Sequence, residues 1–589
     1  MLKKVLVANR GEIAVRVART CAELGITSVA VYSDPDAHAL HVRVADEAIR
    51  LPGSAPKDTY LDAERIVAAA RESGADAVHP GYGFLSENAR FATLVEEAGL
   101  TLVGPSADAM AALGDKVSAR ALAVAAGVPV VPGLDTADLD TARLHAFGET
   151  HGWPVVVKAS LGGGGRGMRV VAGPADADSA LESARAEAMA AFGDSRVFVE
   201  RYLRHPRHVE VQILADAYGA VECWGERDCS VQRRHQKLVE EAPAPGIPDS
   251  VRRQLGEASV RLTKQVGYRG AGTVEFLVED ERFYFLEMNT RIQVEHPVTE
   301  AVFGVDIVRE QLLIAAGAAL PERTAERGPR GHAIECRINA EDPTRDFLPV
   351  PGPLRRLDIP WLPGVRVDSG YEPGDEIPPY YDSLVAKLIV WGPDRDTAIH
   401  RLGAVLARSV LDIPSTLPTA AAVAAHPDFA AGGVSTHWFE SVVAPGLAAS
   451  DDTPVPVEPG VPEPGGVWIG GRFHRVPAAA RRTAGGEARP PGRYVPRLAA
   501  QPAGPGGAAP KRELTSPMRG TVTAVPVAQG DHVVAGQVVA VVEAMKMENP
   551  VRTPSAGVVE TVRTRVGETV SAGAPLVVLT ARADTADPI

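Results

Sequence analysis

The chain has 589 residues, of which 45% are hydrophobic and 23% charged, and its formal net charge at neutral pH is −13. That length exceeds what one hydrophobic core supports, so about three or four domains are expected. The acidic balance, with basic residues scattered along the chain, argues against a nucleic-acid-binding surface. No apolar run reaches the roughly 18 residues of a membrane span, and the N-terminal segment is too polar for a signal peptide. We therefore expect a cytoplasmic protein, with no membrane partner, whose four cysteines are reduced thiols.

Residues 1–115 begin with an alternation of strand and helix. The apolar run from Val5 to Ala8 predicts a strand, a helical pattern follows it, and Val29 to Tyr32 predicts the next strand. Such a βαβ unit indicates a parallel sheet flanked by helices. Residues 116–330 mix strands, hairpins and glycine-rich loops, and residues 331–441 form a further α+β region.

Residues 442–512 differ in composition from everything before them. Thirteen prolines lie between Pro445 and Pro510, many beside alanine or glycine, which predicts an extended tether. Within it, Val467 to Val476 alternates around two glycines, as in a small hairpin. A flexible chain of about 65 residues has an r.m.s. span of about 45 Å, so the tether suggests a domain that travels.

Residues 513–582 contain an internal repeat. The two halves align at an offset of 37 residues, so that Pro517 matches Pro554 and Gly530 matches Gly567. Short alternating strands bounded by glycine predict a small all-β barrel with two-fold internal symmetry. Lys546 falls in the connection between the halves, where we expect a tight exposed turn that presents its amine.

The stretch around this lysine, "EAMKMEN", resembles the signature of biotin carboxyl carrier domains. The resemblance implies that a separate biotin protein ligase joins biotin to the ε-amine of Lys546. Lipoyl carriers share the fold but usually have an acidic residue before the lysine, whereas this chain has Met545. Biotinylation removes the charge of the amine and converts the side chain into a swinging arm.

A glycine-rich stretch follows an apolar strand that ends at Lys158. Residues Gly162 to Gly167 lack bulky side chains except at Arg166, so their backbone N–H groups could close around phosphate oxygens. The stretch matches neither a P-loop nor a dinucleotide fingerprint, and a flexible hairpin is the alternative interpretation.

Two acidic residues are expected to face each other in the stretch from Gly272 to Pro297. If the hairpin loop there has three residues, Glu275 lies opposite Glu287 and Thr273 opposite Asn289. Facing carboxylates repel unless a cation lies between them, and oxygen ligands of this kind suit Mg²⁺. A two-residue loop would instead put the acids on opposite faces, and a pair of solvated acids is the alternative interpretation.

Polar residues alternate along the segment that follows: Asn289, Arg291, Gln293 and Glu295. On an extended segment they share one face. Arg291 could fork onto a small oxyanion while Glu295 accepts a proton, so the pattern indicates a site that binds and deprotonates an anion. Upstream basic residues could neutralise phosphate charge or simply line a solvated strand edge: Arg234, His235 and Lys237.

Motifs along residues 1–440 resemble those of the biotin carboxylases, members of the ATP-grasp superfamily. They include "HPGYGFLSEN", "GDKVSAR", "RRHQK", "EMNTRIQVEHPVTE", "ECRINAEDP" and "PPYYDSLVAKL". The resemblance implies an α/β and α+β multidomain chain: a three-part ATP-grasp biotin carboxylase (1–115, 116–330 and 331–441), the linker and an all-β biotinyl domain. It also implies ATP, bicarbonate and Mg²⁺ or Mn²⁺ as ligands.

The same resemblance implies roles for individual residues. It places ATP among Lys116, Lys158, Gly163, Gly164, Gly165, Gly167, Glu200, Leu203, His208, Gln232 and His235. It assigns the metals to Glu275, Glu287 and Asn289. Bicarbonate and biotin would contact Arg291, Gln293, Val294, Tyr82 and Arg337. Catalysis would use Glu295 as the base, Lys237 beside the transferred phosphoryl group, Arg291, and Arg337 at the biotin ureido oxygen. Leu161 departs from the usual small residue, which should affect only loop mobility.

The implied reaction is ATP- and bicarbonate-dependent carboxylation of biotin on Lys546. Nothing in the sequence resembles a carboxyltransferase, so a separate β subunit of an acetyl- or propionyl-CoA carboxylase should receive the carboxyl group, and a small accessory subunit is compatible with this. Relatives imply a homo-oligomer with Arg19 and Glu23 at the interface. Long relatives carry a folded partner-binding domain where this chain has only the hairpin and tether, which leaves the subunit contacts open. The alternatives are the α subunit of a two-subunit pyruvate carboxylase and an inactive, biotin-presenting scaffold.

Overall fold

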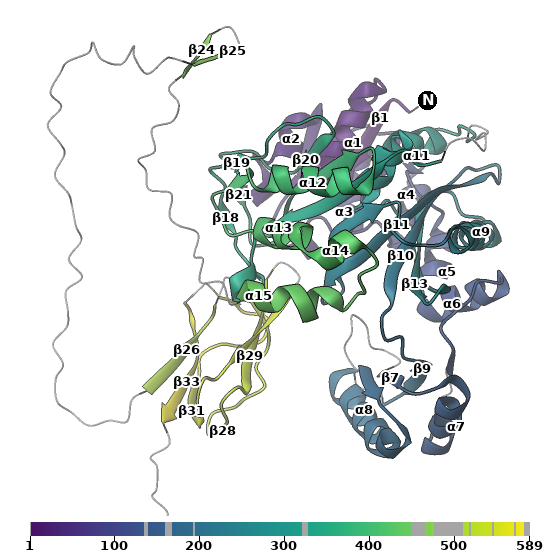
Figure 1. The fold of residues 1–589 in the computed structure, drawn as a ribbon. Helices are drawn as coiled ribbons and strands as arrows, with labels where there is room; N and C mark the ends of the chain where they lie inside the picture. The colour runs from purple at the N-terminus through teal and green to yellow at the C-terminus, as the bar shows by residue number, and fades with distance from the viewer. Residues whose placement is uncertain are drawn as a thin grey trace, which may run out of the picture.

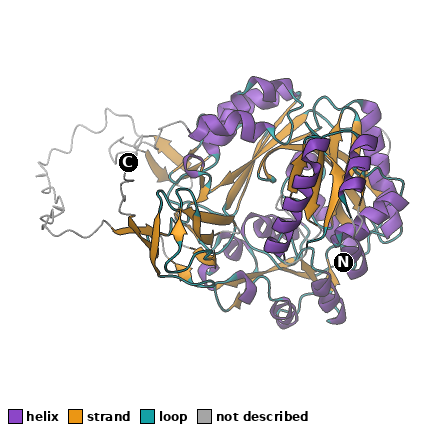
Figure 2. Ribbon diagram, turned by 90° about the horizontal axis from the view of Figure 1, so that it is seen from below, coloured by secondary structure: helices purple, strands orange, loops and turns teal. Residues whose placement is uncertain are grey.

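The structure is a computed structural model, and it describes residues 2–134, 139–159, 168–192, 195–320, 328–448, 466–469, 472–475, 511–517, 520–544, 547–570 and 573–581. Among these residues, no helix is long and apolar enough to cross a membrane. Strands cross the middle of the molecule and helices cover them (Figure 2).

The N-terminal lobe is the predicted parallel sheet, with strand order β3-β2-β1-β4-β5. Its strands are β1 (Lys4–Val7), β2 (Thr27–Ser33), β3 (Glu47–Leu51), β4 (Ala77–His79) and β5 (Thr101–Leu102). Its helices are α1 (Gly11–Glu23), α2 (Leu40–Val44), α3 (Ala63–Glu72), α4 (Ala89–Glu97) and α5 (Ala107–Gly114). Strands β1 and β2 are buried on both faces, as expected for a parallel sheet between helix layers.

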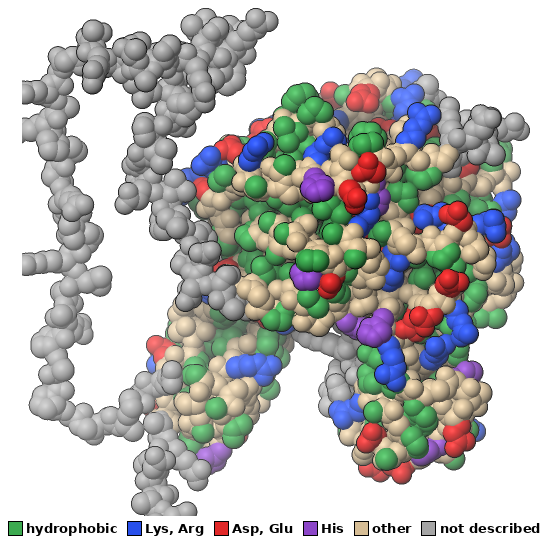
Figure 3. Space-filling model, viewed as in Figure 1, with side chains coloured by type: hydrophobic (Ala, Val, Ile, Leu, Met, Phe, Trp, Pro, Cys, Tyr) green, Lys and Arg blue, Asp and Glu red, His purple; other side chains and the backbone are tan. Residues whose placement is uncertain are grey.

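A second lobe, which we call the lid, projects from the main body (Figures 1 and 3). It follows α6 (Lys116–Ala125) and contains a four-stranded antiparallel sheet of order β6-β9-β7-β8. The strands are β6 (Gly133–Leu134), β7 (Val155–Ala159), β8 (Met168–Val171) and β9 (Val197–Arg201), and the helices are α7 (Thr141–His151) and α8 (Ala177–Phe192). The lid has its own apolar core, so it can move as a unit.

An eight-stranded antiparallel sheet forms the centre of the molecule, in the order β14-β13-β10-β11-β12-β15-β22-β20. Its strands are β10 (Arg207–Ala215), β11 (Val221–Arg233), β12 (Gln236–Ala242), β13 (Gly270–Glu279), β14 (Arg282–Asn289), β15 (His332–Asn339), β20 (Val365–Ser369) and β22 (Leu384–Gly392). Because β12 pairs with β15, one continuous sheet joins the regions on either side of residue 330.

Helices and short strands complete this central part. The helices are α9 (Asp249–Val266), α10 (His296–Phe303), α11 (Ile307–Ala315), α12 (Arg395–Leu406), α13 (Leu417–Ala425), α14 (Pro427–Ala431) and α15 (Ala444–Ala448). Two-residue strands pair as β16 (Glu341–Asp342) with β17 (Leu348–Pro349), β18 (Gly352–Pro353) with β21 (Glu376–Ile377), and β19 (Leu357–Asp358) with β23 (Val410–Leu411). Helix α9 packs on β10 and β11 through buried leucines and alanines.

The loop between β13 and β14 corrects one expectation. It contains two residues, Asp280 and Glu281, because Glu279 pairs with Arg282. Both loop residues have positive φ, 49° and 64°, as in a type I′ turn. The predicted three-residue loop is therefore wrong.

The facing acids nevertheless form, because a β-bulge shifts the register. Leu286 is the extra residue in β14, after which Glu275 pairs with Glu287 and Thr273 with Asn289. The bulge adds the one residue that the shorter loop removes. The predicted pairing is thus confirmed, although by a different route from the one expected.

The C-terminal domain consists of two four-stranded sheets, β26-β33-β31-β28 and β30-β29-β27-β32, which enclose one apolar core. The strands are β26 (Lys511–Thr515), β27 (Gly520–Ala524), β28 (His532–Val533), β29 (Val538–Ala544), β30 (Met547–Arg552), β31 (Gly557–Val562), β32 (Thr569–Val570) and β33 (Pro575–Ala581). The repeat is visible in the backbone, since Gly530 and its counterpart Gly567 have φ values of 94° and 87°. Lys546 lies outside the described residues, but β29 and β30 pair up to Ala544 and Met547 on either side of it.

The predicted linker hairpin is also present. Strands β24 (Gly466–Ile469) and β25 (Arg472–Arg475) pair in antiparallel fashion, and Figure 1 shows them far from the other labelled elements. The rest of the expected tether, including residues 476–510, lies outside the described residues.

Replacement of Gly520 should test whether the C-terminal domain folds independently of the carboxylase part. A side chain at Gly520 would strike the backbone oxygen of Glu543 on the neighbouring strand. Gly520→Val should therefore abolish most biotinylation by a co-expressed biotin ligase, measured by streptavidin blot, while carboxylation of free biotin persists. Thr521→Val, at the next and exposed position, is the matched control and should be biotinylated normally. Loss of both activities in Gly520→Val would contradict independent folding.

Candidate active site

A row of charged residues crosses four neighbouring strands of the central sheet. Arg227 on β11 pairs with Glu210 on β10, Glu210 pairs with Glu275 on β13, and Glu275 pairs with Glu287 on β14. Directly paired residues lie on the same face of an antiparallel sheet, so three carboxylates stand side by side. Such a row is stable only where cations offset the repulsion.

Lys237 supplies the central cation. Its Nζ lies 2.7 Å from Glu210 Oε2, 2.9 Å from Glu275 Oε1 and 2.6 Å from Glu295 Oε1. It also donates to Gln293 Oε1 at 3.2 Å. Burial alone would lower the pKa of Lys237, but Glu210, Glu275 and Glu295 raise it well above its usual value. The ammonium therefore stays charged at the centre of the site.

Arg227 anchors the buried end of the row. Its guanidinium is fully buried, forms an ion pair with Glu210, and donates to Gln212 Oε1 at 2.8 Å and Thr299 Oγ1 at 3.0 Å. Its donors are thus satisfied inside the protein, as a buried charge requires. Burial raises the pKa of Glu210, and Arg227 opposes that rise.

The two predicted metal-binding carboxylates differ in their environment. Burial would raise the pKa of Glu275, but Lys237 and then His208, whose Nε2 lies 2.9 Å from Glu275 Oε2, lower it well below its usual value. Glu287 is exposed at the edge of the site, and desolvation in the cleft and the neighbouring Glu275 carboxylate raise its pKa. A cation between the two would remove that repulsion, so the pair fits a divalent metal ion.

The third proposed ligand, Asn289, is already engaged in this structure. Its Nδ2 donates to Glu275 Oε1 at 2.9 Å and its Oδ1 accepts from Arg291 Nη2 at 3.0 Å. A different set, His208, Glu210 and Glu275, has ligand atoms within 4.8 Å of one another. Lys237 is bonded to two of those carboxylates, so an ammonium rather than a metal ion fills that position. The edge formed by Glu275 and Glu287 is the better metal site.

The segment after β14 corrects a second expectation. It is not extended throughout, because residues 290–295 form bends and a turn, and Glu295 (φ −82°, ψ 11°) precedes α10. Its polar residues converge even so, since Gln293 Nε2 donates to Glu275 Oε1 at 2.7 Å. Arg291 Nε donates to Glu87 Oε2 at 2.9 Å, which fixes the guanidinium at the site. The predicted grouping thus forms, but through a turn rather than a strand.

Glu295 lies between two cations. Its Oε1 contacts Lys237, and its Oε2 lies 3.0 Å from Arg337 Nη2. Burial would raise the pKa of Glu295, but Lys237 and Arg337 lower it below its usual value. The residue is therefore held as a carboxylate, which is the form that can accept a proton.

The remaining predicted residues occupy both the lid and the sheet. On the lid, Lys158 Nζ lies 2.6 Å from Glu200 Oε2, and Arg120 also contacts the Glu200 carboxylate. Leu203 is buried against Val131 and Tyr284. The others are dispersed: Lys116 is exposed at the start of α6, Gln232 is buried on β11, and His235 is exposed in the turn before β12. Leu161, Gly163, Gly164, Gly165 and Gly167 lie outside the described residues.

On the opposite side of the site, Tyr82 belongs to a buried chain of polar contacts. Its hydroxyl bonds to Glu12, which lies 2.9 Å from Lys387 Nζ. Lys387 in turn donates to the backbone oxygen of Val294 at 2.9 Å. This chain fixes the turn that carries Glu295.

Several residues that organise the site were missed from the sequence: Glu12, Glu87, Glu210, Arg227 and Lys387. Each acts through a contact with a residue distant in the chain. Glu210 alone carried a usable signal, because it occupies the strand that pairs with Glu275.

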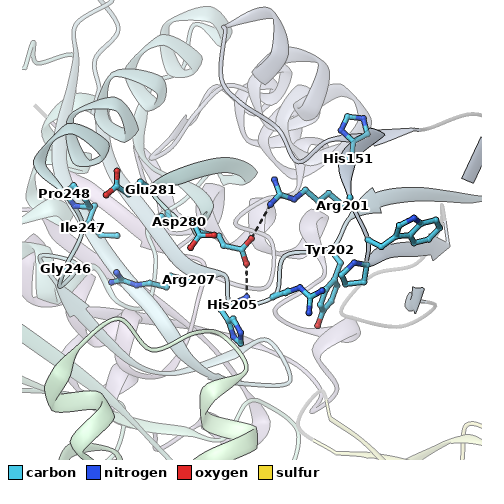
Figure 4. Close-up of a pocket in the computed structure, with 16 residues that line it drawn as sticks. His151, Arg201, Tyr202, His205, Arg207, Gly246, Ile247, Pro248, Asp280 and Glu281 are labelled. Carbon is cyan, nitrogen blue, oxygen red and sulfur yellow. Dashed lines mark hydrogen bonds and ion pairs between the residues drawn. The ribbon is translucent and has the colours of Figure 1, made fainter. Parts of the chain in front are cut away.

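A cavity of about 570 Å³ lies at the hinge between lid and central sheet, away from this row. His151, Arg201 and His205 are among its lining residues (Figure 4). The Glu279 carboxylate accepts from the backbone N–H of His205 at 2.8 Å and lies 3.8 Å from Arg201 Nη2. Apart from these hinge contacts, the cavity includes none of the residues expected to act on ATP or bicarbonate.

Family models match four consecutive segments of the chain. They are the biotin carboxylase N-terminal domain (residues 1–110), the carbamoyl-phosphate synthase L chain ATP-binding domain (115–323), the biotin carboxylase C-terminal domain (335–441) and the biotin-requiring enzyme domain (512–579). The fold and site thus define an ATP-grasp biotin carboxylase followed by a biotin carrier.

Curated relatives cover different shares of the chain. Biotin carboxylase of Haemophilus influenzae is 50% identical over 75% of this chain and 98% of its own length. The biotin-dependent acyl-coenzyme A carboxylase alpha3 subunit of Mycobacterium leprae is 45% identical over 98% of both chains. The chain belongs to the biotin carboxylase family, in the group of α subunits of biotin-dependent acyl-CoA carboxylases that carry their own biotin domain. It is an ATP-dependent ligase that uses biotin, ATP and Mg²⁺.

Solved structures agree with the fold of the carboxylase part. The Campylobacter jejuni biotin carboxylase in complex with an ATP analogue has a TM-score of 0.70 at 43% identity, covering 75% of this chain and 99% of its own. The biotin carboxylase domain of a thermophilic 2-oxoglutarate carboxylase bound to bicarbonate has a TM-score of 0.73 at 45% identity, covering 76% and 100%.

Glu287→Gln should raise the free Mg²⁺ concentration needed for bicarbonate-dependent ATP hydrolysis, at saturating MgATP, by about tenfold or more. The amide removes one of the two charges that face each other across the hairpin. Glu281→Gln removes a charge from the exposed turn of the same hairpin and should leave the Mg²⁺ dependence unchanged. An unaltered Mg²⁺ requirement in Glu287→Gln would place the metal elsewhere.

Proposed function

We propose that this protein carboxylates biotin on its own Lys546 and delivers the carboxyl group to a separate carboxyltransferase subunit that uses acetyl-CoA or propionyl-CoA. The observation that carries the proposal is the match over 98% of both chains to an acyl-CoA carboxylase α subunit. One of the two subunits of the pyruvate carboxylase of Methanothermobacter thermautotrophicus is 48% identical but covers only 75% of this chain. A keto-acid acceptor is therefore the second candidate, supported by the carboxylase part alone.

We assign the bicarbonate half of the reaction to the cluster around Lys237. Arg291 and Gln293 hold bicarbonate beside the Glu275 carboxylate, and Glu295 accepts the bicarbonate proton. Lys237 then offsets the charge of the phosphoryl group being transferred from ATP. Bound Mg²⁺, held by Glu275, Glu287 and Asn289, supplies further compensation of phosphate charge. The short contacts of Lys237 to Glu210, Glu275 and Glu295 support this assignment.

We assign the ATP and biotin subsites to the residues on either side of that cluster. The ATP residues are Lys116, Lys158, Gly163, Gly164, Gly165, Gly167, Glu200, Leu203, His208, Gln232 and His235. On the biotin side, Arg337 stabilises negative charge on the ureido oxygen, and Tyr82 and Val294 shape the pocket. The contact between Arg337 and Glu295 supports a close approach of the two half-reactions.

The proposed partners follow from the same function. A biotin protein ligase modifies Lys546, a carboxyltransferase β subunit receives the carboxyl group, and a small accessory subunit is compatible. We place a homo-oligomer contact at Arg19 and Glu23, both exposed on α1. We propose the cytoplasm as its compartment, because ATP and bicarbonate are available there and the chain has four free cysteines.

Capture of the protein from its own cells through its biotin should bring down a carboxyltransferase subunit. The captured complex should consume acetyl-CoA or propionyl-CoA with ATP and bicarbonate, measured as labelled bicarbonate fixed into acyl-CoA, and should leave pyruvate unused. Fixation into pyruvate instead would overturn the acyl-CoA proposal.

Lys546→Ala is the control for that capture. It removes the only proposed biotin attachment point, so the variant should not bind streptavidin. Its carboxylation of free biotin should stay within about twofold of the unaltered chain, since the carboxylase site is on separate elements. Capture of the same partner by Lys546→Ala would mean that the capture is not through Lys546.

A further inference from the structure

Arg337 is held between two carboxylates of different character. Its Nη2 lies 3.0 Å from Glu295 Oε2, on the reacting side of the site. Its Nε lies 2.6 Å from Oε1 of Glu240, a fully buried residue on the neighbouring strand β12. Because Glu295 loses its charge when it accepts a proton, its attraction for Arg337 weakens during the proposed reaction. Glu240 is the contact that does not change at that step.

Glu240 itself faces a second buried carboxyl group. It pairs directly with Glu335 across β12 and β15, and both residues are fully buried. Neither oxygen of Glu335 has a hydrogen-bond partner within the described part of the chain, and Oε2 of Glu240 likewise has none there. Two ionised carboxyls in directly opposed positions would repel strongly with so little solvation. The geometry is therefore stable with one proton on the pair.

The neighbouring charges decide where that proton resides. Arg337 bonds to Glu240, whereas the nearest cation to Glu335, Lys387 on β22, donates to Glu12 and to the backbone oxygen of Val294. The other titratable groups that influence the pair are Glu295, Lys237, Cys229 and Cys336. Burial raises the pKa of Glu335 well above its usual value, and burial raises that of Glu240 to about 7 despite Arg337. The proton thus resides on Glu335 and leaves Glu240 to hold Arg337.

We propose that Glu240 and Glu335 are positioning residues for the biotin half-reaction: a buried carboxyl pair sharing one proton that keeps Arg337 aimed at the biotin ureido group. The inference rests on the role of Arg337 in the proposed function. It assigns to the site two residues that touch neither ATP nor bicarbonate.

Glu240→Gln in the full-length chain tests the inference. Two rates are measured with free biotin as substrate: biotin carboxylated and ATP hydrolysed in the presence of bicarbonate. The amide removes the charge that holds Arg337, so the ratio of carboxylation to hydrolysis should fall about 10- to 100-fold, the range for a lost charged hydrogen bond. Glu240→Asp, which keeps the charge on a shorter side chain, should restore part of the ratio.

The pH dependence separates positioning from a merely structural effect. A second proton neutralises Glu240 as the pH falls through about 7, so the ratio in the unaltered chain should decline on the acid side. Glu240→Gln has no carboxyl there to titrate, so its ratio should lack that decline. A decline of equal size in Glu240→Gln would overturn the inference.

Glu241→Gln is the matched control. Glu241 is the next residue of β12 and is also buried, but its carboxylate bonds to His332 and Arg395 rather than to Arg337. Its replacement should leave the ratio unchanged even if it lowers thermal stability. An unchanged ratio in Glu240→Gln, or an equal fall in Glu241→Gln, would overturn the inference alone. Absence of biotin carboxylation by the unaltered chain would overturn the proposed function together with it.

Discussion

The ammonium of Lys237 is the contact on which the rest of the site depends. Three carboxylates stand in one row across β10, β13 and β14, and a fourth, Glu295, approaches from the turn before α10. Without a buried cation, this arrangement would be electrostatically unfavourable. Lys237 bonds to Glu210, Glu275 and Glu295 together, which holds three separate segments in register. The same charge that stabilises the free protein is available to a transferred phosphoryl group.

That arrangement explains why the fold needs one continuous sheet. Lys237 comes from β12, and Arg337 from β15, which pairs with β12. The ATP-grasp part and the C-terminal part therefore contribute to a single reaction centre through backbone pairing rather than through a mobile interface. The lid, by contrast, has its own core and contributes Lys158 and Glu200, so its position can change without disturbing the carboxylate row.

Much of the outline could be predicted from the sequence, and the limits have identifiable causes. The βαβ start, the repeat in the C-terminal domain and the Glu275–Glu287 pairing all follow from local periodicity. That pairing formed through a two-residue loop and a bulge at Leu286, two features that cancel and that alternation alone does not reveal. The ion pairs of Glu210, Glu87 and Glu240 were missed, because they depend on the register between strands far apart in the chain. Lys546 was found from its motif, without any structural contact.

The central claim is that the site around Lys237 and Glu295 serves the biotin attached at Lys546. The most direct measurement is to incubate biotinylated full-length protein with labelled bicarbonate, ATP and Mg²⁺, and to count the label on the peptide that contains Lys546. We predict ATP-dependent labelling of that peptide, slowed by about two to four orders of magnitude in Glu295→Gln, the range for a lost general base. Labelling that needs no ATP, or that proceeds at an unchanged rate in Glu295→Gln, would contradict the account.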